Sequence, residues 1–226
     1  MNTSSRYPKA YLVIGIVAAI IAIAIVIWKA SVVEHLSSGV SKQTFTVDCE
    51  FDRFRQIMVR KNATAAIVGH SGMTLLSEKV QDIELDTSRD DRPLLNAIRG
   101  KSKSEVTAIK IITVGLDDPT LEASKLVLRQ VANIHTSEID VTTQATGPAG
   151  RLEQYSTTLN AQPDSQGTQV TISVEMRVRV KVPMLFVSRA DVRVQQAADA
   201  AINGQTAAIK QFIIENADQR IILPDL

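Results

Sequence analysis

The stretch that most constrains the fold is Thr168–Val182, which reads TQVTISVEMRVRVKV. From Gln169 onward its even-numbered positions are apolar and its odd-numbered positions are polar. Side chains alternate between the two faces of a strand, so the pattern predicts a long strand with one dry face and one wet face. The seven apolar side chains of the dry face are Val170, Ile172, Val174, Met176, Val178, Val180 and Val182. At about 1.5–3 kcal/mol for each buried side chain, this face requires a partner element.

The segment after this strand has the pattern of that partner. Pro183 ends the strand because proline has no N–H for the ladder. From Met184 the apolar period becomes that of a helix, which predicts one long helix over Met184–Asn216. Much of its apolar stripe is alanine, so the helix presents a slim surface that can approach a sheet closely. The stripe includes Val187, Ala190, Val194, Ala197, Ala201, Ile202, Ala208, Ile209, Phe212 and Ile213.

A second apolar feature lies near the N-terminus, where Tyr11–Trp28 contains no charged residue. As a helix this run, together with Ala10, spans about 28 Å, close to the thickness of the hydrocarbon core of a bilayer. Aromatic rings at both ends fit the membrane interfaces. A cleaved signal peptide and a buried core helix are the alternatives. The length of the run and the Trp28-Lys29 pair that ends it favour a retained transmembrane anchor in the lipid bilayer.

Basic residues set the expected orientation of this span. Arg6 and Lys9 precede it, while Lys29 and Lys42 follow it. The positive-inside rule favours a cytoplasmic N-terminus and an exported domain. We expect an N-terminal tail over 1–10, a transmembrane helix over 11–28, a stalk rich in serine and glycine over 29–43, a folded domain over 44–217 and a C-terminal tail over 218–226.

The first half of the expected domain mixes strands and helices. Thr44–Phe51 alternates like a strand, with Cys49 on its apolar side. Such a cysteine is expected to pack as a small hydrophobe, because no activating neighbour is evident. Asp52–Gly69 reads as one or two helices that Asp52 caps. Met73–Asp86 and Glu105–Val114 read as strands. The charged stretch between them, Thr87–Lys103, reads as a solvated loop and lacks the spacing of a calcium loop.

The second half leads up to the long strand. Asp117-Asp118-Pro119 is typical of a helix start, so a helix is expected from Pro119 to about Ala132. A strand over Leu126–Ile134 is the alternative, and the sequence leaves helix or strand open across Pro119–Ile134. Thr136–Thr146 and Arg151–Gln162 alternate again, separated by turns. With the long strand they predict a three-stranded antiparallel meander.

Composition and motifs weigh against several classes of function. The chain has 226 residues, with 25 Lys and Arg against 24 Asp and Glu, so no basic face for nucleic acid is required and no nucleic-acid partner is expected. Its three histidines stand far apart, and no metal or cofactor is expected. No hydrolase elbow, phosphate loop or zinc-protease motif occurs, so no catalytic residue is assigned. Arg177, Arg179 and Lys181 form a basic row on the wet face of the long strand, either solvated or in contact with anionic headgroups.

The order of elements, together with the junction VRVKVPML at Val178–Leu185 and the helix over Val192–Glu215, resembles the START-like (SRPBCC, polyketide-cyclase) superfamily, in an uncharacterised branch. The resemblance covers about Phe45–Ala217. It implies an α+β helix-grip domain, in which a curved antiparallel sheet wraps around a long C-terminal helix, added here to the single transmembrane helix. Members of this superfamily often enclose a cavity for lipids, sterols or other apolar molecules.

On this resemblance we expect a non-enzymatic, membrane-anchored domain that binds a lipid or another hydrophobic small molecule. The expected lining of its cavity is Val174, Met176, Val178, Val180, Val194, Ala198, Ile202 and Ile209. The same residues could equally form a solid core. The first alternative is therefore a cell-envelope interaction or assembly protein with no cavity, whose protein partners the sequence does not identify. The second is a cyclase- or hydrolase-type enzyme, which would need polar groups inside the cavity.

Overall fold

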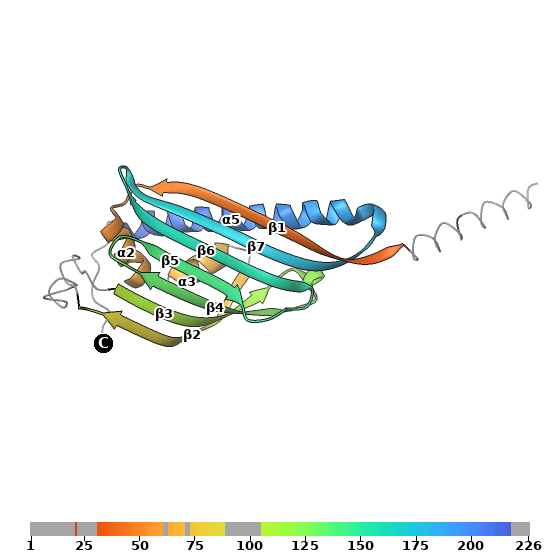
Figure 1. Ribbon diagram of the computed structural model, residues 1–226, viewed down its shortest axis with the longest axis horizontal. Coiled ribbons are helices and arrows are strands. Elements are labelled where there is room, and N and C mark those ends of the chain that lie inside the picture. Colours follow the sequence, from red (N-terminus) through yellow and green to blue (C-terminus); the bar gives the residue numbers. More distant parts are fainter. Residues whose placement is uncertain (1–20, 22–30, 61–62, 71–72, 89–104, 218–226) are drawn as a thin grey trace, which may run out of the picture.

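The computed structural model describes residue 21 and residues 31–60, 63–70, 73–88 and 105–217, and these residues form a seven-stranded antiparallel sheet (Figure 1). Along the sheet the strands follow the order β1-β7-β6-β5-β4-β3-β2. Their bounds are β1 Val32–Val47, β2 Met73–Asp86, β3 Glu105–Leu116, β4 Lys125–Ile134, β5 Ile139–Ala145, β6 Leu152–Asp164 and β7 Gly167–Pro183. Only the step from β1 to β2 crosses the sheet, so every later strand pairs with its neighbour in sequence.

Helices cover one face of this sheet. Two short helices, α2 (Phe51–Arg60) and α3 (Ala63–His70), lie between β1 and β2 in the chain. The long helix α5 (Val187–Ala217) follows β7 through the single turn η2 (Met184–Phe186). Figure 1 shows α5 behind the sheet, running along β1 and β7. The predicted α+β helix-grip architecture, a sheet around a long C-terminal helix, is confirmed.

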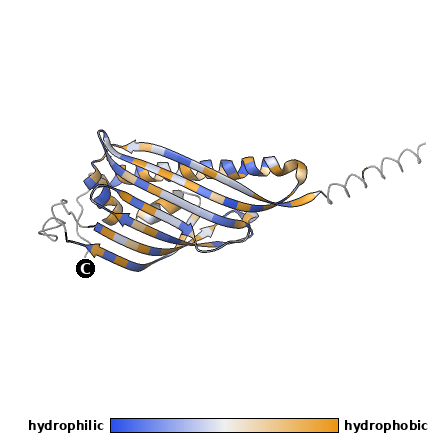
Figure 2. Ribbon diagram, in the orientation of Figure 1, coloured by the Kyte–Doolittle hydropathy of each residue, from blue (hydrophilic) through white to orange (hydrophobic). Residues whose placement is uncertain are grey.

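The alternation that predicted β7 is confirmed by its burial. Val170, Ile172 and Val174 are almost fully buried on the face toward α5, and their odd-numbered neighbours are more exposed. Figure 2 shows the same alternation of hydrophobic and hydrophilic residues along the other strands. Beyond Met176 the inward side chains of β7 become half-buried, so the contact between sheet and helix loosens toward the start of α5.

The predicted stalk is wrong. Residues 32–43 belong to β1, which pairs with β7 in register from Val32 opposite Pro183 to Val47 opposite Thr168. Two of the residues that suggested a linker, Ser37 and Gly39, lie under α5. Ser37 is fully buried, and a Cβ atom added at Gly39 would stand 2.5 Å from the Val194 carbonyl oxygen. Small residues are needed here because the helix backbone crosses the strand directly. Of the predicted first strand, Thr44–Phe51, only Thr44–Val47 belongs to β1, and Phe51 already begins α2.

The stretch left open between helix and strand is a strand. After Asp118 the chain makes only the single turn η1 (Pro119–Leu121), in which the Asp118 side chain accepts a hydrogen bond from the Thr120 backbone N–H. β4 then starts at Lys125, and its inward residues Leu126 and Leu128 are buried. The predicted helix from Pro119 is therefore wrong, because its capping residues close one turn and not a longer helix.

The expected anchor over Tyr11–Trp28 lies outside the described residues, apart from Ile21, and the tails over 1–10 and 218–226 also lie outside them. In the part of the chain that the structure describes, no helix has both the length and the apolar character needed to cross a bilayer.

Candidate ligand-binding site

The larger of two hollows lined by described residues, here called the wide cavity, lies between the last part of β7 and the first half of α5. Its volume is about 1070 Å³. On the sheet side it is lined by the inward residues of β7 from Met176 to Val182, and on the helix side by small residues such as Ala190 and Ala201. Alanine has no side chain beyond Cβ, so the helix leaves space that larger residues would fill. The wide cavity is a predominantly apolar chamber.

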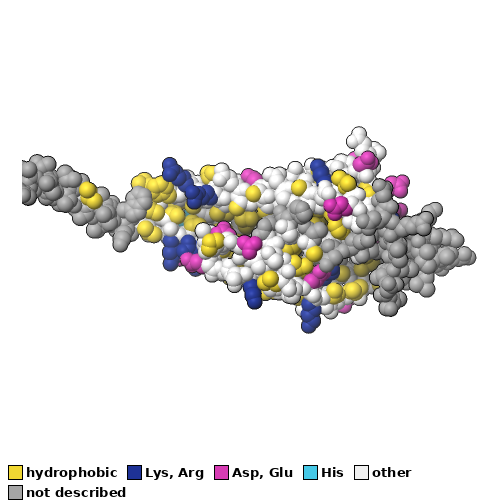
Figure 3. Space-filling view, turned by 180° about the vertical axis from the view of Figure 1, so that it is seen from behind, with side chains coloured by type: hydrophobic (Ala, Val, Ile, Leu, Met, Phe, Trp, Pro, Cys, Tyr) yellow, Lys and Arg dark blue, Asp and Glu magenta, His cyan; other side chains and the backbone are white. Residues whose placement is uncertain are grey.

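One end of the wide cavity is bordered by the turn between β7 and α5. Phe186, Arg189 and Arg193 line it there, and the Arg189 guanidinium lies 5.2 Å from the centre of the Phe186 ring. Just outside, Met184 and Leu185 are 72% and 86% exposed. In Figure 3 hydrophobic side chains gather at this end of the molecule, with Lys and Arg side chains on both sides of them. This end of the molecule therefore combines exposed apolar side chains with basic side chains around them.

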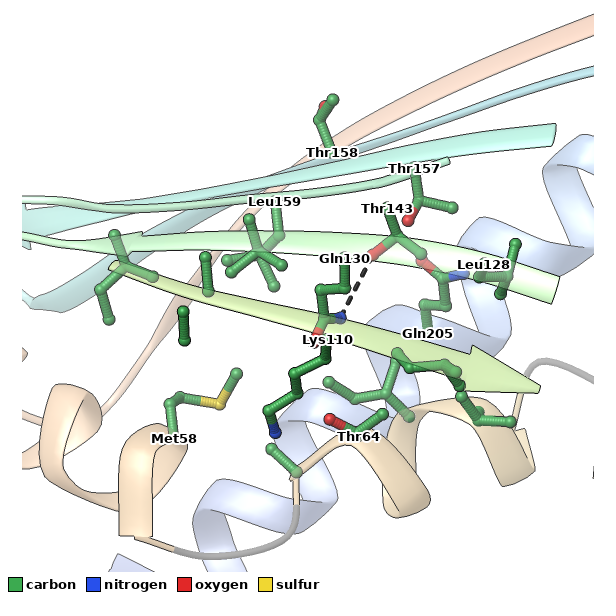
Figure 4. A pocket seen from close by; sticks show the side chains of 18 of the residues that line it. Met58, Thr64, Lys110, Leu128, Gln130, Thr143, Thr157, Thr158, Leu159 and Gln205 are labelled. Atoms are coloured by element: carbon green, nitrogen blue, oxygen red, sulfur yellow. Dashed lines mark hydrogen bonds between the residues drawn. The ribbon is translucent and has the colours of Figure 1, made fainter. Parts of the chain in front are cut away.

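A second hollow, the narrow cavity, lies between β3–β6 and the helices α2, α3 and the second half of α5. Its volume is about 370 Å³, and its walls are largely apolar, with Ile112, Leu128 and Ile139 among them (Figure 4). On α5 the larger residue Ile209 takes the place that alanines hold beside the wide cavity.

Four polar side chains, here called the polar row, cross the wall of the narrow cavity. They are Lys110, Gln130, Thr143 and Thr157, one from each of β3, β4, β5 and β6. Lys110 is directly opposite Gln130, Gln130 opposite Thr143, and Thr143 opposite Thr157. The Gln130 amide donates a hydrogen bond to the Thr143 hydroxyl at 3.2 Å. Figure 4 shows the row with Gln205 of α5 pointing toward its Thr143 and Thr157 end.

The Lys110 ammonium at the end of the polar row is paired. It lies 2.6 Å from a Glu78 carboxylate oxygen on β2, and both side chains are less than one-third exposed. The pair has no net charge, so it brings hydrogen-bonding groups to the cavity edge without a net electrostatic preference for an anion or a cation.

Tyr155 and Met73 line both cavities, which therefore adjoin at these two residues. The Tyr155 hydroxyl accepts a hydrogen bond from the Gln205 amide at 3.4 Å. Because Tyr155 is buried, desolvation of the phenolate raises its pKa to about 12. Tyr155 is thus a neutral hydrogen-bonding group at ordinary pH, with no tendency to act as a base.

The residues expected to line a cavity divide into three groups. Met176, Val178, Val180 and Val194 line the wide cavity, and Ile209 lines the narrow cavity. The other three, Val174, Ala198 and Ile202, are almost fully buried and belong to neither lining. They pack in the core between sheet and helix.

The polar row could not be recognised from the long strand that became β7, because its four residues lie on four other strands. A signal was present on β3, where Lys110 interrupts the apolar face formed by Val106, Ala108 and Ile112. On β4 the same signal at Gln130 was hidden by the helix interpretation.

Other candidate groups offer less chemistry. Cys49 is buried as predicted, and desolvation raises the pKa of its thiol, so the reactive thiolate is disfavoured. Within the described ranges, no three His, Cys, Asp or Glu residues are grouped as metal ligands would be. The predicted basic row on β7 is exposed and ion-paired, for example Arg179 with Glu153 at 2.7 Å. Of the described residues that line the narrow cavity, Lys110 and Tyr155 are the titratable ones.

The strand order, the two short helices after β1 and the long C-terminal helix define the class of this protein as an α+β helix-grip fold. No family model matches the chain, and no curated protein matches it either.

Several solved structures resemble this chain loosely. Ara h 8.0201 is 12% identical, with 80% of this chain and 100% of that chain covered and a TM-score of 0.44. The Zhui aromatase/cyclase from Streptomyces sp. R1128 is 10% identical, with coverages of 83% and 97% and a TM-score of 0.45. The protein of unknown function SA2116 from Staphylococcus aureus is 9% identical, with coverages of 82% and 99% and a TM-score of 0.47. At these values the class rests on the chain's own topology.

Proposed function

We propose that this protein is a membrane-anchored domain that binds a lipid or another hydrophobic small molecule without converting it. The observation that carries the proposal is the wide cavity, about 1070 Å³ between β7 and α5. Its valine and alanine residues offer an apolar guest a large apolar contact, and charged residues such as Asp118, Arg151 and Arg193 also belong to its lining. Removal of the guest's apolar surface from water would supply about 25 cal/mol per Å².

The position of the wide cavity supports a membrane role. Its Phe186 end lies beside exposed Met184 and Leu185, at the end of the molecule where β1 begins. The expected span over Tyr11–Trp28 precedes β1 in the chain, so the span would hold this end near the bilayer. A hydrophobic molecule could then pass between leaflet and cavity without crossing much water.

Native mass spectrometry of the full-length protein extracted in detergent tests the binding. We expect a co-purified apolar molecule of constant mass on the wild-type protein. Ala201→Phe places a ring in the wide cavity and should remove this adduct. Ala207→Phe is the matched control, because Ala207 is exposed on the same helix, and it should keep the adduct. A folded wild-type protein without any adduct would overturn the proposal.

We also propose that the N-terminus is cytoplasmic and the domain exported, as the basic residues before the span suggest. Gln211 is exposed on α5, whereas the single cysteine of the wild type is buried. A membrane-impermeant maleimide should therefore label Gln211→Cys in intact cells and leave the wild type unlabelled. Labelling only after the cells are lysed would place the domain on the cytoplasmic side.

The enzymatic alternative gains one observation, the polar row, since a cyclase or hydrolase needs polar groups inside its cavity. Its described titratable neighbours are a paired lysine and a tyrosine whose pKa is about 12, and neither is poised as a general base near neutral pH. In the wide cavity, Asp118 accepts hydrogen bonds from Thr120 and Arg151 pairs with Glu122, so these charged groups are engaged as well. Binding is therefore the function that the geometry supports better. The alternative of an interaction protein without a cavity is disfavoured by the two cavities themselves.

A further inference from the structure

The polar row supplies hydrogen-bonding groups to the narrow cavity. A plain hydrocarbon ligand would not use these groups. We infer that the narrow cavity recognises an apolar molecule through an uncharged oxygen group, an alcohol or a carbonyl, held by the polar row. This inference rests on the proposed binding function and names the class of molecule that is bound.

The geometry of the polar row is that of a continuous ladder. Its four residues come from four adjacent strands and are directly opposite one another in register. Neighbouring strands are about 4.8 Å apart, so the ladder is about 14 Å long. Gln205 points toward one end of it from α5 (Figure 4). A ligand between sheet and helix would meet polar groups from both sides.

Fold stability alone does not account for the polar row. Polar side chains on a buried face cost free energy unless each is hydrogen-bonded. The hydrogen bond from Gln130 to Thr143 uses one of the two donors of the amide and leaves its carbonyl oxygen for another partner. Leucine and valine would fill the same space without that cost, as Leu128 and Val141 do on the neighbouring inward positions. The retained amide and hydroxyl groups fit a role in recognition.

The charge of the row selects a neutral group. Lys110 is the cation of the row, and its ammonium is already paired with Glu78 at 2.6 Å. A carboxylate or phosphate on the ligand would have to compete with Glu78 and would be repelled by it. The oxygen of an alcohol or a carbonyl can instead accept from the Gln130 amide, and an alcohol can also donate to its oxygen, while the ion pair stays intact.

The surroundings leave space for the apolar remainder of the ligand. Outside the polar row the walls are mostly aliphatic, with Ile112 and Leu128 beside the row. At Met73 and Tyr155 the narrow cavity adjoins the wide cavity. A chain fixed by its oxygen at the polar row can therefore extend along apolar surface toward the membrane-side end.

A competition among three probes of equal chain length tests the inference. Full-length protein in detergent is mixed with dodecane, 1-dodecanol and dodecanoate, re-isolated by size exclusion, and the retained probes are quantified by gas chromatography. We expect 1-dodecanol to be enriched about fivefold to tenfold over dodecane, the gain of about one hydrogen bond. The double variant Gln130→Leu/Thr143→Val should remove the enrichment while it keeps the binding of dodecane. Because both partners of one hydrogen bond are replaced, the fold should tolerate the change.

The control carries similar substitutions on the opposite face of β5, at Thr142→Val/Gln144→Leu, and should keep the enrichment. Equal retention of alcohol and hydrocarbon by the wild type, or enrichment that survives in the double variant, would overturn this inference and leave the proposed function standing. Preferential retention of dodecanoate would also overturn it. If the wild type retains none of the three probes, the proposed function itself fails.

Discussion

The two cavities are formed by the same sheet and the same long helix, yet they differ in size and in chemistry. Beside the wide cavity α5 presents alanines, and beside the narrow cavity it presents larger side chains such as Ile209. Between them Ala198 and Ile202 pack in the core with Val174 of β7. Alanines of α5 therefore open space beside the wide cavity only where β7 lies farther from the helix, because Ala198 is fully buried in the core.

The two cavities also differ in the polarity of the side chains that the sheet supplies to them. β7 supplies the wide cavity with valines only on its inward face beyond Met176, because its alternation is unbroken there. β3, β4, β5 and β6 each place one polar residue on their inward face at the same level, and so produce the polar row. We therefore expect the wide cavity to supply affinity and the narrow cavity to supply selectivity.

The largest expected effect concerns the contact of α5 with β1, which keeps α5 in place beside the wide cavity. A Cβ atom at Gly39 would lie 2.5 Å from the Val194 oxygen, and its other close neighbours are also backbone atoms that cannot rotate away. Gly39→Ala should lower the free energy of unfolding by about 3 kcal/mol. Urea unfolding of the full-length protein in detergent, followed by circular dichroism, measures this change.

The matched control is Gly69→Ala in α3, where nothing lies within 4 Å of the added Cβ. There alanine should stabilise the helix by up to about 1 kcal/mol. If the two variants have equal stability, α5 is not seated on β1 as closely as the structure has it.

The next effect tests the boundary between the cavities at Tyr155. Burial raises the pKa of this phenol to about 12, while an unfolded chain titrates near 10. The folded state thus holds the proton more tightly, so the stabilisation is complete below pH 10 and is lost as the pH rises from 10 to 12. The loss should be about 1.4 kcal/mol per pH unit across that window.

Urea unfolding at pH 9, 10 and 11 measures this dependence, with absorbance at 295 nm as a check on ionisation. Tyr155→Phe has no phenol at this position and should lose markedly less stability than the wild type over the same range. Parallel pH profiles for the two proteins would mean that water reaches Tyr155 and that the two cavities form one hydrated space.

The long strand and the long helix could be predicted because each carries its own pattern. Thr168–Val182 alternates without a break, and the stripe after Pro183 repeats with the helical period. Both patterns are local, so they survive without knowledge of the partner. The wide cavity follows from them in part, since the inward valines of β7 and Val194 were expected as lining residues.

The errors arose where tertiary contacts decide the structure. Ser37 and Gly39 suggest a linker by composition, but they are small because α5 crosses them. Asp118 caps a turn that ends at Leu121, and only the pairing of β4 with β3 shows that a strand follows. The polar row also depends on register, because Lys110 and Thr157 belong to one row only if four strands align.

A smaller difference in stability is expected between breaking the ion pair at the polar row and breaking an ion pair on the wet face of the sheet. Lys110→Met leaves the Glu78 carboxylate, whose side chain is 18% exposed, without its partner. The expected loss of stability is about 1–2 kcal/mol. Arg177→Met, which breaks the exposed pair with Glu175, should cost no more than about 0.5 kcal/mol.

Urea unfolding of both variants supplies the measurement, and Lys110→Met/Glu78→Gln should regain part of the loss because the charge is then removed. Equal costs at the two sites would show that the edge of the narrow cavity is as well hydrated as the surface, and would weaken the case for a neutral ligand there.

The smallest effect is a pH dependence on the side of the wide cavity, where His35 of β1 lies 2.8 Å from an Asp191 carboxylate oxygen on α5. The hydrogen bond with His35 holds the pKa of Asp191 below its ordinary value. The carboxylate therefore stabilises the fold above about pH 4, and the contribution is lost as the pH falls through the lowered pKa of the folded state. Both side chains are partly exposed, so we expect the pair to contribute only about 0.5 kcal/mol to the free energy of unfolding.

The difference in unfolding free energy between the wild type and Asp191→Asn should thus be small at pH 6 and should vanish toward pH 2. His35→Gln should behave in the same way. A difference that persists at pH 2 would assign the effect to packing at the start of α5. The position of α5 beside the wide cavity would then depend on side-chain packing and not on this pair.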